Sequence, residues 1–177
     1  MRAKPALSSI FKSGRPEDTL RLARLLAGLL TGGEVLSLKG MIGAGKTFFV
    51  KGLAAALGSG VSPVSASFNL MRTYRGSGGR SGGLNIYHFD LFRISPEEVR
   101  NIGMEDYLGL KDGVTAIEWA SPAEHLYGRG DHLELDFELA GGDSREIKAS
   151  ARGPGAAVLL GRLREKWLKE SGRGSKA

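Results

Sequence analysis

Residues 35–57 read VLSLKGMIGAGKTFFVKGLAAAL, and this stretch decides the fold class. The apolar run at 35–38 predicts a short buried strand, and a glycine-rich segment follows it. Residues 47–57 then carry apolar side chains at helical spacing and stop at Gly58. The order strand, glycine loop, helix is the context that a phosphate-binding loop requires.

The segment from Gly40 to Thr47 fits the complete Walker A pattern G-x-x-x-x-G-K-[ST] of a P-loop. Glycines let successive backbone N–H groups turn toward phosphate oxygens, and the helix N-terminus adds its positive end. In this pattern Lys46 reaches the β and γ phosphates, and Thr47 is a ligand for Mg²⁺. The alternative, an ordinary glycine turn before a helix, requires the whole pattern to have arisen by chance. The residues expected to bind the nucleotide are Met41, Ile42, Gly43, Ala44, Gly45, Lys46, Thr47 and Phe48.

Outward from this stretch, strand and helix patterns alternate along the chain. The predicted elements are a helix from Pro16 to the stop at Gly32-Gly33, a strand within 61–74, a mobile hairpin tip at 75–83, a strand at 84–89, a short helix from Ser95, a strand at 114–119, an antiparallel hairpin of 132–139 with 145–151, and a helix at 154–169. We therefore expect one α/β domain over residues 1–177, with a core at about 16–150 and a C-terminal helix at about 154–170. Its fold is predicted to be a three-layer P-loop NTPase-like domain, with a central mixed sheet between helices and the hairpin at the sheet edge.

Composition excludes several other classes of protein. The chain has 177 residues, 41% of them hydrophobic, and no Cys, which suits one soluble domain without disulfides or Cys-based sites. No apolar stretch approaches the roughly 18 residues that span a bilayer, and the N-terminus lacks a secretory signal, so we expect a cytoplasmic protein and no membrane partner. The net charge of +6 comes from the two ends, residues 1–24 and 161–177. The basic ends either keep the protein soluble or attract RNA or an acidic partner, and both explanations stay open.

Two acidic residues are candidates to hold Mg²⁺ or to orient water beside the loop. Asp90 and Glu118 each end an apolar strand downstream of the P-loop. An isolated carboxylate in such a place is often only a strand-end acid or a helix cap. Because the carboxyl ends of strands in an open α/β sheet lie on the ligand side, the shared position favours a function for both residues.

These motifs together resemble one family. The loop GAGKT, the segment SASF at 65–68, HFDLFR at 88–93, IGMEDYL at 102–108 and IEW at 117–119 occur in the order of the TsaE (YjeE) family, over about residues 16–148. The resemblance implies a small P-loop ATPase that binds ATP and Mg²⁺ and acts with the TsaB and TsaD proteins in making threonylcarbamoyladenosine in tRNA. It also implies that hydrolysis resets the TsaB–TsaD pair and that this chain does not transfer the group itself.

The resemblance also implies roles for individual residues. Carried over by motif, Lys46 and Thr47 bind phosphate and Mg²⁺, Ser67 stands in for a switch-type Thr, Asp90 supports the metal, Glu118 positions or activates water, and Trp119 is a partner or switch contact. Four positions depart from the family pattern: Ala66 and Ser67 replace Pro and Thr, Met41 stands where Asp is frequent, and Ala120 stands where Pro is usual. Serine keeps a hydroxyl for the metal but loses the methyl group that restrains χ1.

Three further features have more than one interpretation each. His88 is either a buried core imidazole or an orienting partner for Asp90 or Glu118. Arg93 is a γ-phosphate contact, a partner contact or an ion-pair partner of Glu97. The apolar stripe of the C-terminal helix (Leu159, Leu160, Leu163 and Trp167) suits the core better than a docking surface.

Two other functions compete with an ATPase of tRNA modification. A small-molecule or nucleoside kinase shares the loop, but it commonly has a lid with several arginines, whereas the loop at 75–83 offers only Arg75 and Arg80 among glycines. A nucleotide-dependent interaction module with little turnover would need no positioned water. Glu118 is therefore the residue that separates the module from an ATPase.

Overall fold

The computed structural model describes residues 7–60, 70–77 and 83–173. Within these residues the strands are β1 (Leu7–Ser13), β2 (Val35–Gly40), β3 (Met71–Tyr74), β4 (Asn85–Asp90), β5 (Gly113–Glu118), β6 (His132–Leu139) and β7 (Arg145–Arg152). The α-helices are α1 (Pro16–Ala27), α2 (Lys46–Ala56), α3 (Pro96–Val99), α4 (Glu124–Tyr127) and α5 (Pro154–Arg173), and the 3₁₀ helices are η1 (Met104–Tyr107) and η2 (Ser121–Ala123). None of the helices in the described part is long and apolar enough to cross a bilayer.

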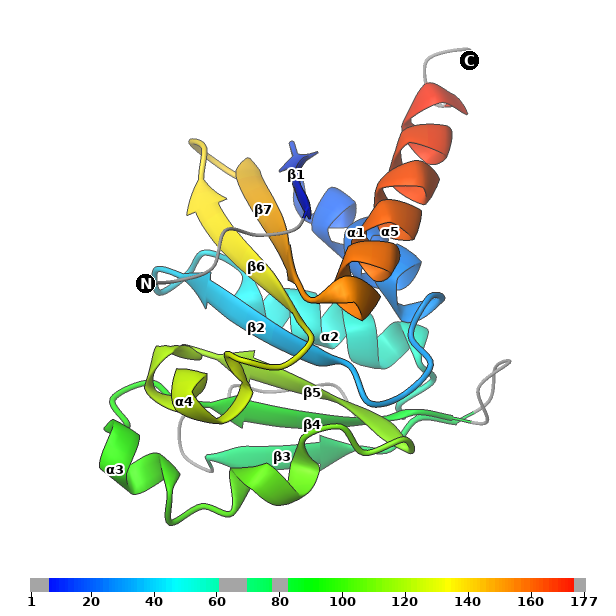
Figure 1. Cartoon of the computed structure of the whole chain (residues 1–177). Helices are drawn as coiled ribbons and strands as arrows, with labels where there is room; N and C mark the ends of the chain where they lie inside the picture. Colours follow the sequence, from blue (N-terminus) through cyan, green and yellow to red (C-terminus); the bar gives the residue numbers. More distant parts are fainter. Residues whose placement is uncertain (1–6, 61–69, 78–82, 174–177) are drawn as a thin grey trace.

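The described strands form one mixed sheet in the order β1-β7-β6-β2-β5-β4-β3 (Figure 1). Strands β6, β2, β5 and β4 run parallel, whereas β7 pairs antiparallel with both β6 and β1, and β3 pairs antiparallel with β4. The P-loop strand β2 therefore lies in the middle of the sheet, between β6 and β5. The carboxyl ends of four parallel strands meet at one edge, where a ligand site is expected in this class of fold.

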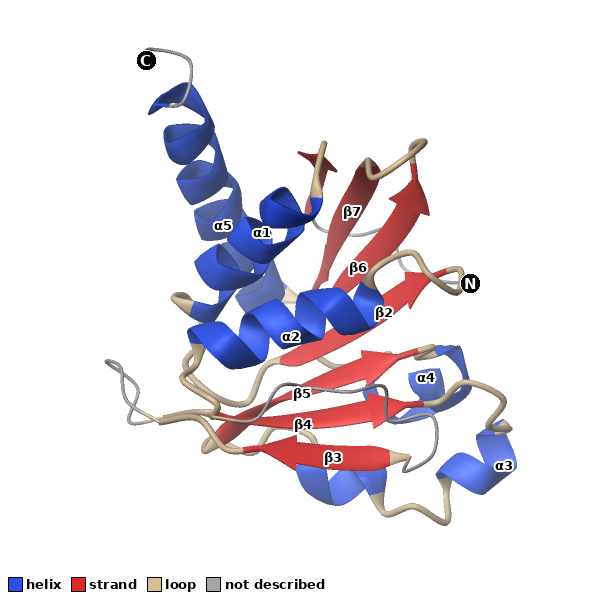
Figure 2. Cartoon of the chain, turned by 180° about the vertical axis from the view of Figure 1, so that it is seen from behind, coloured by secondary structure: helices blue, strands red, loops and turns tan. Residues whose placement is uncertain are grey.

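Helices cover both faces of this sheet. Figure 2 shows α1, α2 and α5 on one face and α3 and α4 on the other. The central strands are apolar on both sides, as a doubly covered sheet requires. Along β5, Val114 and Ala116 join the cluster under α1, α2 and α5, whereas Ile117 joins the cluster under the short helices. The expected three-layer α/β architecture is confirmed.

The helix boundaries follow local signals. Helix α1 begins with Pro16 at its first turn, followed by Glu17 and Asp18, and Gly28 ends it. It stops four residues before the predicted end at Gly32, because Leu29 and Leu30 lie in a turn closed by bonds to the carbonyls of the last helical residues. The predicted helix after Ser95 is α3, and its Ser95–Glu98 capping box satisfies two backbone N–H groups.

The position predicted for the C-terminal hairpin is wrong in one respect. Strands β6 and β7 form the expected antiparallel pair, but β6 also pairs with β2, and β1 covers the outer side of β7. The sheet edge on this side is therefore β1, a strand that the sequence analysis did not assign. Its side chains alternate between exposed and half-buried over most of its length, so its apolar pattern is weak.

The predicted strand within 61–74 begins only at Met71 in the described residues, and most of the predicted hairpin tip at 75–83 lies outside them.

Candidate nucleotide-binding site

The P-loop connects the carboxyl end of β2 to the first turn of α2, as the sequence predicts. Gly40 and Gly45 have φ angles of 127° and 109°, conformations that favour glycine. No described side chain caps the N-terminus of α2, and its first turn contains no acidic residue. The free N–H groups and the positive end of the helix dipole are therefore available to an anion.

The Lys46 side chain is buried against its own loop. Its Nζ atom donates to the carbonyl oxygens of Gly40 at 2.8 Å and Met41 at 2.9 Å, and it lies 4.0 Å from the ring centroid of Trp119. Burial lowers the pKa of the Lys46 ammonium, whereas the nearby carboxylates of Glu118 and Asp90 act in the opposite direction. The ammonium is thus already desolvated and oriented at the mouth of the loop.

Asp90 and Glu118 lie side by side, as the sequence analysis expected. They face each other in the register of the parallel strands β4 and β5, and both are buried. Thr47 Oγ1 donates a 3.0 Å hydrogen bond to Glu118 Oε2, and the Phe92 backbone N–H donates to Asp90 Oδ1 at 3.1 Å. One carboxylate therefore contacts the P-loop directly, and the other is held by the turn that follows β4.

A third polar side chain completes this cluster. His88 lies on β4, and its Nε2 atom is 2.9 Å from Glu118 Oε1. Of the two interpretations of His88, the structure therefore favours a partner of Glu118, although the imidazole is also fully buried.

Lys46, Thr47, Asp90 and Glu118 border a cavity of about 380 Å³, and His88 lies behind its lining. Two aromatic rings, Phe92 and Trp119, lie 5.0 Å apart between their centroids at its rim. Trp119 has a φ of 55°, which for a bulky residue is a strained conformation costing about 1–3 kcal/mol. The lining residues are Ile42, Gly43, Gly45, Lys46, Thr47, Phe48, Asp90, Phe92, Glu118 and Trp119.

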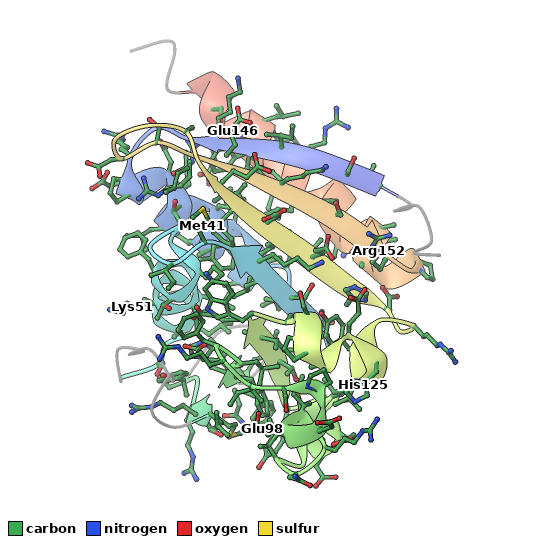
Figure 3. All side chains as sticks on the ribbon, turned by 90° about the vertical axis from the view of Figure 1, so that its left-hand side faces the viewer. Met41, Lys51, Glu98, His125, Glu146 and Arg152 are labelled. Atoms are coloured by element: carbon green, nitrogen blue, oxygen red, sulfur yellow. The ribbon has the colours of Figure 1, made fainter. Side chains whose placement is uncertain are left out.

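The remaining candidates are placed less centrally. Met41, shown in Figure 3, and Ile42 are 74% and 71% exposed on the outside of the loop, while Ala44 is buried beneath it. Arg93 is exposed, with its guanidinium 4.8 Å from the Phe92 ring, and no ion pair joins it to Glu97 in the described chain. Ser67 and Ala66 lie outside the described residues, so the expected contact of Ser67 with the metal stays a prediction.

The oxygen atoms that side chains bring to this cavity suit Mg²⁺, a hard cation that nucleotide oxygens would bind as well. In the described part of the chain, no cluster of three His, Cys, Asp or Glu side chains is placed to hold a metal ion. Thr47, Asp90 and Glu118 nevertheless bring a hydroxyl and two carboxylates to the same cavity, and Mg²⁺ prefers one or two carboxylates together with phosphate oxygens.

One arginine near the loop was missed by the sequence analysis. Arg145 begins β7, and its Nε atom is 4.0 Å from the position that a Cβ on Gly45 would take. Its Nη1 atom donates to the carbonyl oxygens of Gly142 and Ser144. Arg145 is 100 residues from Gly45, so only the pairing of β6 with β2 could have revealed this proximity.

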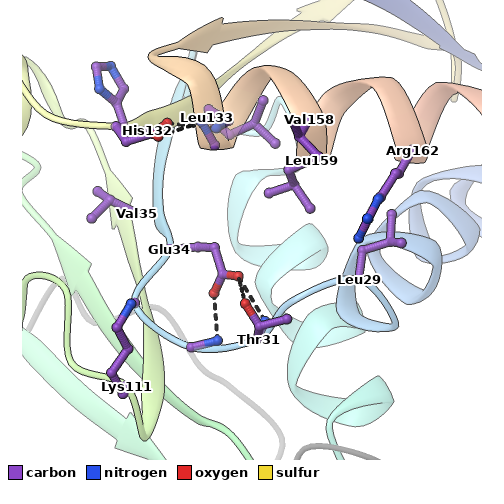
Figure 4. A pocket seen from close by; sticks show the side chains of 15 residues that line it. Leu29, Thr31, Glu34, Val35, Lys111, His132, Leu133, Val158, Leu159 and Arg162 are labelled. Atoms are coloured by element: carbon purple, nitrogen blue, oxygen red, sulfur yellow. Dashed lines mark hydrogen bonds between the residues drawn. The ribbon is translucent and has the colours of Figure 1, made fainter.

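A second cavity, of about 330 Å³, lies at the opposite end of β2 (Figure 4). Its two acidic side chains have structural partners: Glu34 accepts from the N–H groups of Thr31 and Gly32, and Asp131 accepts from the first turn of α5. None of the residues predicted to form the site lines this cavity. Of the predicted site residues that the structure describes, Lys46, Thr47, Asp90, Glu118 and Trp119 gather at the carboxyl end of the sheet.

Comparison with known proteins points to one family. The family model for "Threonylcarbamoyl adenosine biosynthesis protein TsaE" matches residues 13–147. The tRNA threonylcarbamoyladenosine biosynthesis protein TsaE of Bacillus subtilis is 34% identical over 143 residues, covering 81% of this chain and 85% of the relative. The protein of the same name from Rickettsia conorii is 39% identical over 112 residues, covering 62% of this chain and 60% of the relative.

A solved structure extends the similarity to the fold. The crystal structure of Bacillus subtilis YdiB matches with a TM-score of 0.72 and 31% identity, covering 90% of this chain and 96% of YdiB. The family model and the B. subtilis TsaE relative each span more than two thirds of this sequence. The chain therefore belongs to the TsaE family.

Proposed function

We propose that this chain is the Mg²⁺-dependent ATPase that acts with TsaB and TsaD in forming threonylcarbamoyladenosine in tRNA in the cytoplasm. The observation that carries the proposal is the hydrogen bond from Thr47 in the P-loop to Glu118 at the end of β5, with Asp90 beside it. Residues of the P-loop sequence and two carboxylates line one cavity, which supports the proposal. Membership of the TsaE family supports the pathway and the partners.

In this proposal Lys46 exchanges partners when the nucleotide binds. Its ammonium is held by two loop carbonyls and would turn to the β and γ phosphate oxygens. Because burial has already removed much of its hydration, little further desolvation is needed when it meets phosphate. Helix α2 adds its uncapped N–H groups to the same phosphates.

Thr47 and Asp90 would hold the metal side of the nucleotide, and Glu118 lies beside them. A bound Mg²⁺ supplies charge that neutralises the β and γ phosphates. Thr47 would give up its bond to Glu118 in order to bind there, and Asp90 is kept in place by the Phe92 N–H. Glu118 would then be able to orient the attacking water with the oxygen that Thr47 has released.

The test is ATP turnover by the purified chain alone, with TsaB and TsaD, and with tRNA added. We expect weak turnover alone and stimulation in the complex, both abolished by Lys46→Ala. Transfer of phosphate to a small acceptor would indicate the kinase instead. ATP-dependent complex formation without phosphate release would indicate the interaction module. Absence of nucleotide binding would refute all three functions.

A further inference from the structure

The His88 side chain is placed to control the orientation of Glu118. It lies on β4 opposite Ala116 of β5, so its ring reaches diagonally to the carboxylate two residues further along. The imidazole has 0% exposure, and the distance from its Nε2 to Glu118 Oε1 is 2.9 Å. Because both side chains are buried, the geometry of this contact is more definite than that of an exposed pair.

The other ring nitrogen determines which atom carries the proton. His88 Nδ1 is buried and has no hydrogen-bond partner in the described part of the chain. A proton on Nδ1 would be an unsatisfied buried donor, which costs about 1–3 kcal/mol. An unprotonated Nε2 would also direct its lone pair at a carboxylate oxygen of Glu118, and two acceptors facing each other repel. The 2.9 Å contact therefore favours an Nε2–H group that donates to Glu118 Oε1.

Glu118 is thus held at two points, by His88 on one oxygen and by Thr47 on the other. The two contacts differ in the proposed cycle. Thr47 turns to the nucleotide and its metal, so its bond to Glu118 is temporary. His88 lies within the sheet, away from the lining of the cavity, and its bond is not in competition with the nucleotide.

We propose that His88 is a positioning residue that keeps the Glu118 carboxylate oriented when Thr47 releases it. This inference rests on the proposed ATPase function. Without the His88 donor, Glu118 would rotate once its contact with Thr47 is lost, and the reactive step would suffer more than nucleotide binding. His88 itself touches neither nucleotide nor water in this scheme.

Two substitutions of matched shape test the hydrogen bond. From Cβ, Gln reaches an N–H donor and Met reaches a methyl group over the same number of bonds that His uses to reach Nε2. We expect His88→Met to lower single-turnover hydrolysis in the TsaB–TsaD complex by about tenfold or more, which corresponds to about 1.4 kcal/mol. ATP affinity should stay within about threefold, and His88→Gln should recover most of the rate. Equal impairment of both variants, or a parental rate for His88→Met, would overturn the proposal.

A measurement on the nucleotide-free parental protein tests the contact without any activity. The chain has three histidines, so the ¹⁵N signals of His88 can be identified as those that remain when His125 and His132 are replaced by Asn. We expect a proton on Nε2, and an unprotonated Nε2 would overturn the proposal even if both variants failed to fold. If the parental protein binds no ATP, the proposed function fails, and the role of His88 in hydrolysis fails with it. If the parental protein hydrolyses ATP and only the His88 results disagree, the proposed function stands and this inference does not.

Discussion

Replacing Gly40, the first glycine of the P-loop, should destabilise the protein for a reason unrelated to phosphate. Gly40 is the last residue of β2, and its φ of +127° is a conformation that residues with a side chain rarely adopt. A Cβ added there would lie 2.5 Å from the carbonyl oxygen of Phe137 on the neighbouring strand β6. That oxygen belongs to the backbone, so it can move only if β6 moves. Gly40→Ala therefore strains the pairing of the two central strands.

The matched control is Gly43 in the same loop. Its φ is +78°, but a Cβ on it would meet nothing within 4 Å. Gly43→Ala should therefore cost only the backbone conformation, about 1–2 kcal/mol. Gly40→Ala has a backbone cost of about 1–3 kcal/mol and in addition displaces β6, so we expect a total of about 3–4 kcal/mol. The entropy that alanine removes from the unfolded chain is similar at both positions and cancels in the comparison.

Thermal and urea unfolding of the nucleotide-free protein would measure this difference. For a chain of this size, about 1 kcal/mol corresponds to about 2–4 °C in Tm. We expect Gly40→Ala to lower Tm by about 6–16 °C and Gly43→Ala by about 2–8 °C, with the larger effect always at Gly40. An equal loss of Tm in both variants, or a larger loss in Gly43→Ala, would show that the contact with β6 is not the reason why glycine is needed at position 40.

Four further predictions concern the site and the chain ends. Lys46→Ala should abolish useful ATP binding in a nucleotide titration, and unchanged affinity would contradict the role assigned to Lys46. Lys46→Arg should also bind ATP more weakly, because a planar guanidinium does not replace a compact ammonium. Glu118→Gln should lower single-turnover hydrolysis by about 10²-fold with little change in affinity, whereas Asp90→Asn should weaken binding of Mg²⁺-ATP more than that of metal-free ATP. Burial lowers the pKa of His132 in the folded state, so the unfolded state binds more protons at acidic pH. The free energy of unfolding should therefore fall as the pH drops below about 6.5. Urea unfolding at pH 7.5 and 5.5 should show a smaller loss of stability in His132→Asn than in the parental protein. Removing residues 170–177 should leave ATP affinity within about threefold, and any loss of complex formation should shrink at higher salt, since charges are screened beyond about 8 Å near 0.15 M.

The P-loop could be predicted in full because its pattern is contiguous. The strand before Gly40, the helix after Lys46 and the glycines between them are all specified within a few turns of chain, where local geometry dominates. The strand-end positions of Asp90 and Glu118 were also predictable, since apolar runs show where buried strands stop. The class of site and its location at the carboxyl end of the sheet followed from these local signals.

The sequence alone could not decide which groups meet within the site. The partners of Glu118 are 30 and 71 residues away, at His88 and Thr47. Their meeting depends on β4, β5 and β2 being neighbours in one register, and a shift of one residue would turn His88 to the opposite face. The contact between Gly40 and β6 likewise exists only because β6 pairs with β2 rather than lying at the sheet edge. Local sequence therefore determined the loop, the strand ends and the class of fold, whereas strand order and register, which depend on packing between distant segments, determined the partner of each polar atom.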